Sequence, residues 1–91
     1  MSHSADRKLQ LKVDDLVWRE VGDELVVLEL STSAYLTLNG TAKHLWILLS
    51  EGSTVEALMD MLVTKYQIGT DQARSDVESF VSVLADRELL D

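Results

Sequence analysis

The sequence predicts a small α+β domain, in which a three-stranded antiparallel sheet is followed by a bundle of three helices. The chief observation is a change of hydrophobic period at Asn39. Before it, short apolar runs are separated by turn-forming residues, and after it apolar residues recur with the helical period of 3.6. The chain has 91 residues, of which 46% are hydrophobic, and this suits one domain with a single core.

Three short strands are expected in the first half of the chain. The segments 16–21 and 24–30 are rich in valine and leucine, and the pair Gly22-Asp23 between them favours a turn. A second turn is expected at residues 31–33, followed by a third strand over residues 34–38. Connections this short allow only an antiparallel meander.

The N-terminal region has a weaker pattern. Leu9, Leu11 and Val13 alternate with polar residues, which indicates either a short strand or an extended arm. Residues 1–8 are polar and are interpreted as a flexible tail. The folded domain is therefore expected to cover residues 9–91.

The first helix should begin at Asn39, because an asparagine side chain can accept hydrogen bonds from the free N–H groups of a first turn. Gly52 should end it, since glycine readily adopts the left-handed conformation after a helix. The apolar stripe that predicts this helix consists of Ala42, Leu45, Trp46 and Leu49, and Ile47 and Leu48 widen it. A helix with so wide a stripe is expected to lie at the centre of the domain.

The second helix is expected to start with a capping box formed by Ser53 and Glu56. Gly69 should separate it from the third helix, which Thr70 or Asp71 would cap. The core-facing positions are Val55, Leu58, Met59, Leu62 and Tyr66 in the second helix, and Ala73, Val77, Phe80, Val81 and Leu84 in the third.

The composition excludes several classes of function. Sixteen acidic residues against eight basic ones give a net charge of −8, which disfavours nucleic-acid binding. The absence of cysteine excludes disulfides, zinc–thiolate sites and thiol nucleophiles. The polar N-terminus lacks the apolar region of a signal peptide, and no apolar run approaches the roughly 20 residues of a membrane span. We therefore expect a cytoplasmic protein that does not bind membranes.

No set of residues in the sequence has the pattern of a catalytic or metal site. His3 lies in the expected flexible tail, and His44 has no second His, Asp or Glu three or four positions away. Asp14 and Asp15 are neighbours in an extended segment, so their side chains should point to opposite sides. The expected protein is therefore not an enzyme, requires no cofactor or metal, and acts through its surfaces.

One candidate binding surface is the third strand, which would lie at an edge of the sheet. Edge strands are usually protected by charged residues or proline, and this strand has neither. An extended peptide could pair with such an edge as an added strand. The candidate residues are Ala34, Tyr35, Leu36, Thr37 and Leu38. Whether Tyr35 belongs to the core or to this surface stays open.

The second candidate surface is a flank of the third helix. Its residues recur at helical spacing beside the core stripe, with Val83 about 60° beyond Phe80. The candidate groove residues on this helix are Asp76, Val77, Phe80, Val83 and Arg87. The alternative interpretation is a broad core with one exposed valine.

From residue 16 to its end, the chain resembles the PqqD-like proteins. The resemblance lies in Tyr35, in the corner LNGTAKHLWILL that begins at Leu38, and in the helix start STVEAL that begins at Ser53. It implies a winged helix-turn-helix-like fold and a role as a recognition element for the leaders of ribosomally synthesised, post-translationally modified peptides. The leader would bind as a strand beside residues 34–38 and pack against the third helix.

As a stand-alone chain, the protein is most similar to the leader-binding proteins of lasso-peptide clusters. This likeness implies that it delivers the precursor to a cysteine-protease-like leader peptidase and to an ATP-dependent cyclase. The alternative within the family is a peptide chaperone for a radical S-adenosylmethionine enzyme of the pyrroloquinoline quinone pathway. Two other classes share some of these features: a winged-helix DNA-binding protein, which would need a basic third helix, and a carrier protein, which would need a phosphopantetheine serine.

Overall fold

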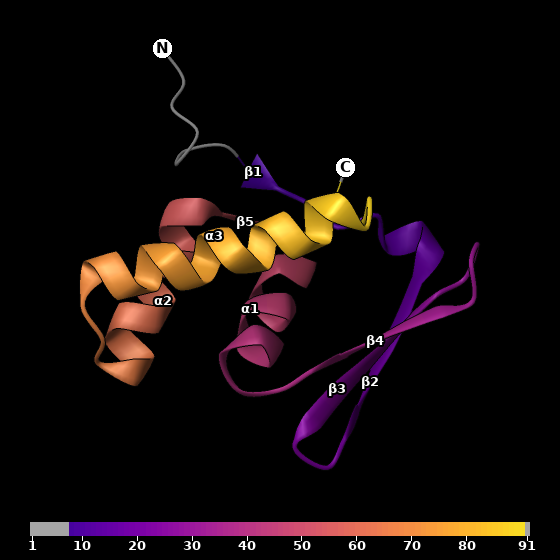
Figure 1. Cartoon of the computed structure of the whole chain (residues 1–91), viewed down its shortest axis with the longest axis horizontal. Helices are drawn as coiled ribbons and strands as arrows, with labels where there is room; N and C mark the ends of the chain where they lie inside the picture. Colours follow the sequence, from indigo (N-terminus) through magenta and orange to yellow (C-terminus); the bar gives the residue numbers. More distant parts are fainter. Residues whose placement is uncertain (1–7, 91) are drawn as a thin grey trace.

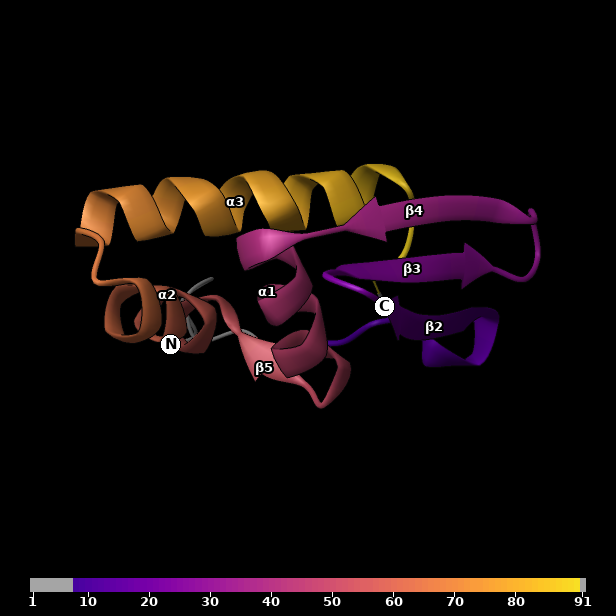
Figure 2. The same cartoon turned by 90° about the horizontal axis from the view of Figure 1, so that it is seen from below.

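The computed structural model describes residues 8–90 and confirms the α+β fold (Figure 1). Two small strands and a short 3-10 helix accompany the predicted elements. The main sheet contains β2 (Leu16–Val21), β3 (Glu24–Glu29) and β4 (Ala34–Leu38). The helices are α1 (Gly40–Ser50), α2 (Val55–Tyr66) and α3 (Thr70–Asp86). The helices gather at one end of the molecule, and the sheet extends from them (Figures 1 and 2).

The main sheet is an antiparallel meander in the order β2-β3-β4, as predicted. Val17 pairs with Leu28 and Leu28 with Tyr35, whereas Trp18 pairs with Val27 on the next row. Because side chains alternate across a strand, these two rows lie on opposite faces of the sheet. Val27 is fully buried, so its row faces the core, and the row that contains Tyr35 faces solvent.

A second, two-stranded sheet ties the N-terminal region to the helices. β1 (Lys8–Leu9) pairs antiparallel with β5 (Ser53–Thr54), and Leu11 forms a bridge with Leu90. The 3-10 helix η2 (Val13–Asp15) then leads into β2. Of the predicted tail, Lys8 lies in β1, and residues 1–7 lie outside the described residues.

The start of α2 differs from the predicted capping box. Thr54 is the N-cap, and its hydroxyl oxygen accepts a hydrogen bond of 3.0 Å from the backbone N–H of Ala57. Ser53 is instead paired with Leu9 in the small sheet and is buried. Pairing with β1 therefore moves the start of the helix by one residue.

The other two predicted caps are also different in the structure. Asn39 occupies the N-cap position of α1, but its side chain makes no capping hydrogen bond. The chain enters this helix through Gly40, whose φ of +56° is a conformation that glycine adopts easily. Gly69 is the N-cap of α3, in place of Thr70 or Asp71, and its carbonyl accepts from the N–H of Ala73.

The core lies between the inner face of the sheet and the three helices. Trp46 of α1 is fully buried, and its ring meets that of Trp18 edge to face, with 5.6 Å between the ring centroids. Such aromatic contacts add to the free energy gained from apolar burial. The prediction of a central first helix is therefore confirmed. Around Trp46 the core contains Leu16, Leu25, Val27, Leu38, Leu45, Leu49, Leu58, Leu62, Ala73, Val77, Phe80, Leu84 and Leu89.

Candidate functional site

Strand β4 has a free edge. It pairs with β3 on one side, and residues 8–90 contain no strand that pairs with its other side. In Figure 2, β3 lies on one side of β4 and the C-terminal half of α3 lies on the other. Unpaired N–H and C=O groups of β4 are thus available beside a helix.

The register of the sheet determines which residues point their backbone groups to this edge. Val21 and Glu24 flank a two-residue turn, so they form a hydrogen-bonded pair. Hydrogen-bonded and non-hydrogen-bonded pairs alternate along an antiparallel ladder. It follows that Leu36 directs its N–H and C=O toward β3, while Tyr35 and Thr37 direct theirs toward the free edge.

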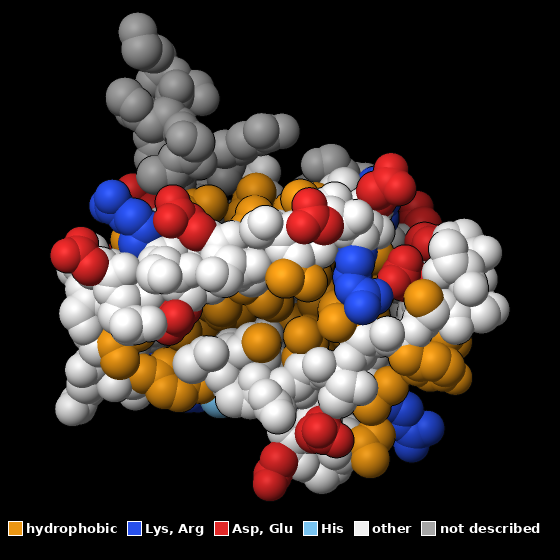
Figure 3. All heavy atoms as spheres, viewed as in Figure 1, with side chains coloured by type: hydrophobic (Ala, Val, Ile, Leu, Met, Phe, Trp, Pro, Cys, Tyr) orange, Lys and Arg blue, Asp and Glu red, His pale blue; other side chains and the backbone are white. Residues whose placement is uncertain are grey.

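A hollow lined by hydrophobic side chains follows α3 on the side of β4 (Figure 3). Val83 is 46% exposed and lies about 60° around the helix from the buried Phe80. Leu36, on the inner side of β4, is half-buried against the core. The edge of β4 and the exposed flank of α3 therefore form two walls of an apolar groove, named here the β4–α3 groove.

An ion pair closes one end of the β4–α3 groove. Arg87, directly after α3, donates to the carboxylate of Glu29 at the end of β3, with 3.3 Å between Nη1 and Oε2. The Glu29 side chain is only 9% exposed, whereas that of Arg87 is 39% exposed. Glu29 is also the register partner of Ala34, which is half-buried at the start of β4. This pair fixes the C-terminal end of α3 against the sheet and places charge beside the free edge.

The remaining α3 candidates divide between groove and core. Asp76 is half-buried on the groove flank and accepts a hydrogen bond of 2.8 Å from Gln72. Phe80 is 8% exposed and belongs mainly to the core. Val77 is fully buried on the opposite flank, so we remove it from the groove residues.

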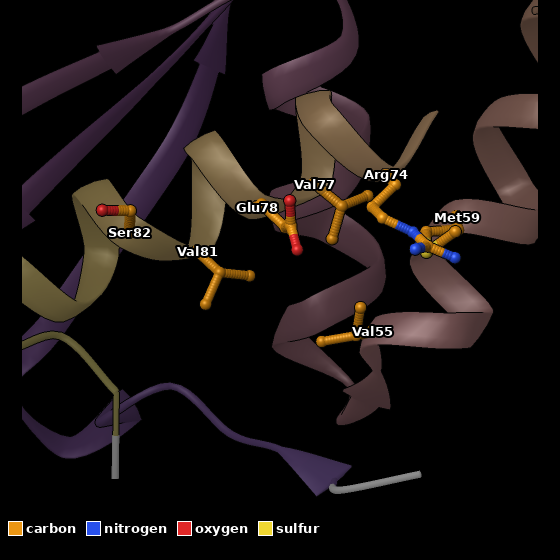
Figure 4. A pocket seen from close by; sticks show the side chains of 7 residues that line it. All are labelled: Val55, Met59, Arg74, Val77, Glu78, Val81 and Ser82. Carbon is orange, nitrogen blue, oxygen red and sulfur yellow. The ribbon is translucent and has the colours of Figure 1, made fainter. Parts of the chain in front are cut away.

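The opposite flank of α3 lines a different cavity, with a volume of about 550 Å³. Figure 4 shows Val77 and Val81 of α3 across from Val55 and Met59 of α2, with Arg74 extending toward Met59. No strand edge borders it among the residues that line it. It is therefore separate from the β4–α3 groove.

Tyr35 lies on the outer face of the sheet and is 65% exposed. The structure therefore excludes it from the core. Its ring is on the face opposite to Leu36, so it cannot line the β4–α3 groove itself.

The pair formed by His44 and Tyr66 is a contact that sequence reasoning did not find. His44 Nδ1 and the Tyr66 hydroxyl form a hydrogen bond that connects α1 to the end of α2. Desolvation lowers the pKa of His44 below its usual 6.5, and the positive charges of Lys65 and Lys43 lower this pKa further, against the opposing effect of Glu20. The two residues are 22 positions apart, and only the packed helices bring them together.

Acidification from about pH 7 to about pH 5.5 should therefore lower the thermal stability of the protein. In this range the unfolded chain protonates His44 more readily than the folded chain does. The stabilising contribution of neutral His44 is thus fully present above pH 6.5, the usual pKa of histidine, and is lost as the pH falls below this value. Melting temperatures measured across this range should fall less steeply for His44→Phe. Equal slopes for the two proteins would contradict the assignment, because their other titrating groups are the same.

Between residues 8 and 90, no group of three or more His, Cys, Asp or Glu side chains is placed to hold a metal ion. Within the same range, no helix has the length and hydropathy needed to cross a membrane.

Comparison with known proteins gives one family and two similar structures. Residues 24–90 match the family described as "Coenzyme PQQ synthesis protein D (PqqD)". The solved structure "TbiB1 in Complex with the TbiA(beta) Leader Peptide" is 30% identical, covers 90% of this chain and 94% of its own, and has a TM-score of 0.82. "Lasso peptide synthetase B1 complexed with the leader peptide" is 20% identical, with coverage of 90% and 95% and a TM-score of 0.80, and supports the fold alone. No curated protein sequence matches the chain.

Proposed function

The chain belongs to the PqqD family, and from this premise we propose that it is a peptide-binding protein that captures the leader of a ribosomally synthesised precursor peptide. The observation that carries the proposal is the free edge of β4 opposite the exposed flank of α3. The similar TbiB1 structure, which was solved in complex with the TbiA(beta) leader peptide, supports it.

Binding proceeds by strand addition. An extended leader pairs with the outward N–H and C=O groups of Tyr35 and Thr37 and becomes the fourth strand of the sheet. The main chain of the leader supplies much of the affinity, so the protein tolerates variation in the leader sequence. Side chains at alternate positions then enter the β4–α3 groove beside Val83 and Leu36, where apolar groups are favoured. Arg87 and Asp76 lie at the groove flank, where they orient charged groups of the leader.

The protein itself performs no chemistry on the peptide. Its role is delivery, in the lasso-type pathway to a cysteine-protease-like leader peptidase and to a cyclase. Holding the leader raises the effective concentration of the attached core peptide near a bound enzyme, so the enzyme should work at lower precursor concentration. The purified chain alone should therefore leave a precursor peptide unchanged, as followed by mass spectrometry. Turnover that persists after repurification would contradict a purely binding role.

The decisive experiment is a calorimetric titration with synthetic leaders. The first peptide is the leader of the precursor encoded beside the gene for this chain, the second is the TbiA(beta) leader, and scrambled versions of each are the controls. We expect saturable binding of at least one leader and slower amide hydrogen exchange in residues 34–38. If neither leader binds better than its scrambled version, leader capture is wrong. Tight binding without protection of β4 would place the site elsewhere.

A second candidate within the family is a peptide chaperone for a radical S-adenosylmethionine enzyme. The family description, which names coenzyme PQQ synthesis, favours it. Both functions use the same groove, and they differ in the enzyme that receives the peptide. Co-purification of the chain with each enzyme, in the presence and absence of leader, distinguishes them. DNA binding is disfavoured because α3 contains four acidic residues and only one basic residue, Arg74.

A further inference from the structure

The outer face of the main sheet carries an apolar patch that neither the core nor the β4–α3 groove uses. Of the large hydrophobic residues that are most exposed in residues 8–90, three lie on this face: Val17 at 51%, Val21 at 53% and Tyr35 at 65%. Leu28 and Val26, which are half-buried, lie between them. Together these five residues form what we call the outer patch, and a shallow hollow of about 280 Å³ lies over it.

The register of the main sheet places one end of this patch at the free edge of β4. Val17, Leu28 and Tyr35 are successive register partners on β2, β3 and β4, so they form one apolar row across the sheet. The row ends at Tyr35, and the next position in the same direction is the one an added strand would occupy. A residue of that strand opposite Tyr35 would have its side chain on the same face, within reach of the tyrosine ring.

We propose that one row of the outer patch, formed by Tyr35, Leu28 and Val17, is a second subsite for the captured peptide, on the face of the sheet opposite the β4–α3 groove. The proposal rests on leader capture by strand addition and extends it. One side chain of the bound strand packs against Tyr35 and completes the apolar row. Neighbouring side chains of opposite parity enter the groove beside Val83.

This arrangement defines the class of peptide that the protein takes. A residue beside Tyr35 and a residue in the groove must be separated by an odd number of positions, because side chains alternate along a strand. Both should be apolar or aromatic. A leader residue opposite Thr37 would also point to the outer face of the sheet. Its row consists of Thr37, Val26 and Arg19, so polar leader residues are tolerated at this position.

A second copy of the chain is a poorer occupant of the outer patch. Three strands of about five residues offer roughly 250 Å² of face, well below the ~800 Å² that each partner contributes to a stable dimer. The net charge of −8 also opposes self-association. A single peptide side chain fits the size of the patch.

The test compares Tyr35→Ser with Val21→Ser, using the leader that binds in the calorimetric titration. Both residues are exposed on the same face, but Val21 lies on β2, which is separated from the free edge of β4 by β3. We expect Tyr35→Ser to weaken leader binding about fivefold, Tyr35→Phe to retain it, and Val21→Ser to have no effect. Analytical ultracentrifugation of the three proteins reports whether the patch instead joins two copies.

A double-mutant cycle identifies the peptide residue that contacts Tyr35. Each leader position in the protected segment is replaced by serine and measured with wild-type and Tyr35→Ser protein. One outward-facing position should lose its effect in the variant, while positions that enter the groove should keep theirs. If no leader binds in the calorimetric titration, leader capture is wrong and this proposal falls with it. If β4 is protected but Tyr35→Ser binds with unchanged affinity, or no position couples to it, the second subsite is wrong and leader capture stands.

Discussion

Replacing Thr37 with proline should weaken leader binding by at least about thirtyfold, or roughly 2 kcal/mol, and leave the protein folded. The register directs the N–H of Thr37 to the free edge of β4. Proline removes this donor, and its ring occupies the space where the leader main chain would approach. The leader carbonyl that would accept the bond is then left without a partner.

The fold should survive because the lost N–H makes no bond within the sheet. Proline is tolerated in edge strands when its nitrogen faces outward. The same change at Leu36 would be uninformative, because the N–H of Leu36 is directed to β3 and its loss would disrupt the ladder. The measurements are the dissociation constant for leader and the melting temperature of each protein.

Glu20→Pro is the matched control. Glu20 is exposed on β2, the other edge of the sheet, and the same alternation directs its N–H outward. The substitution also removes the ion pair of Glu20 with Lys43, a surface contact of small energy. Unchanged leader affinity in Glu20→Pro and a large loss in Thr37→Pro would locate the peptide at β4. Equal effects of the two prolines, or none, would contradict pairing at this edge.

The strands of the main sheet and the helices could be predicted because each is determined by residues that are close together in the sequence. The strand boundaries follow from turn residues such as Gly22, and the helices follow from the period of their apolar residues. The small sheet could not be predicted, because Lys8 and Leu9 pair with residues more than forty positions away. That pairing also explains the misplaced cap: Ser53 has the right chemistry to start a helix, but a strand partner holds it.

In the candidate site, too, features that depend on neighbouring residues could be predicted, and contacts between distant residues could not. Helical angles alone placed Val83 beside Phe80 and outside the core, and its exposure agrees with that prediction. They did not reveal that Val77 faces α2, because this depends on how two helices pack. The partner of Arg87 was also hidden, since Glu29 lies 58 positions earlier in the chain. Which face of the sheet Tyr35 occupies likewise required the structure, because strand alternation does not say which side is the core.

Val83 provides the second test, on the helix wall of the β4–α3 groove. Replacing it with aspartate should weaken leader binding by at least about tenfold, or roughly 1.4 kcal/mol, because a bound apolar side chain would bury the carboxylate without a partner. The melting temperature should change little, since Val83 is already 46% exposed. Phe80 is a poorer choice because it is largely buried, and its truncation would confuse lost stability with lost binding.

Ala85→Asp is the control for charge at Val83. Ala85 is exposed on the same turn of α3, about 160° around the helix from Val83, so the added carboxylate is far from the β4–α3 groove. Both variants carry the same extra negative charge and the same change near the helix C-terminus. If leader binding depends only on net charge, the two variants will be weakened equally. If the α3 flank is a wall of the site, only Val83→Asp will lose affinity. A stable Val83→Asp protein that binds leader as tightly as wild type would remove the helix from the site and leave the β4 edge as the sole contact.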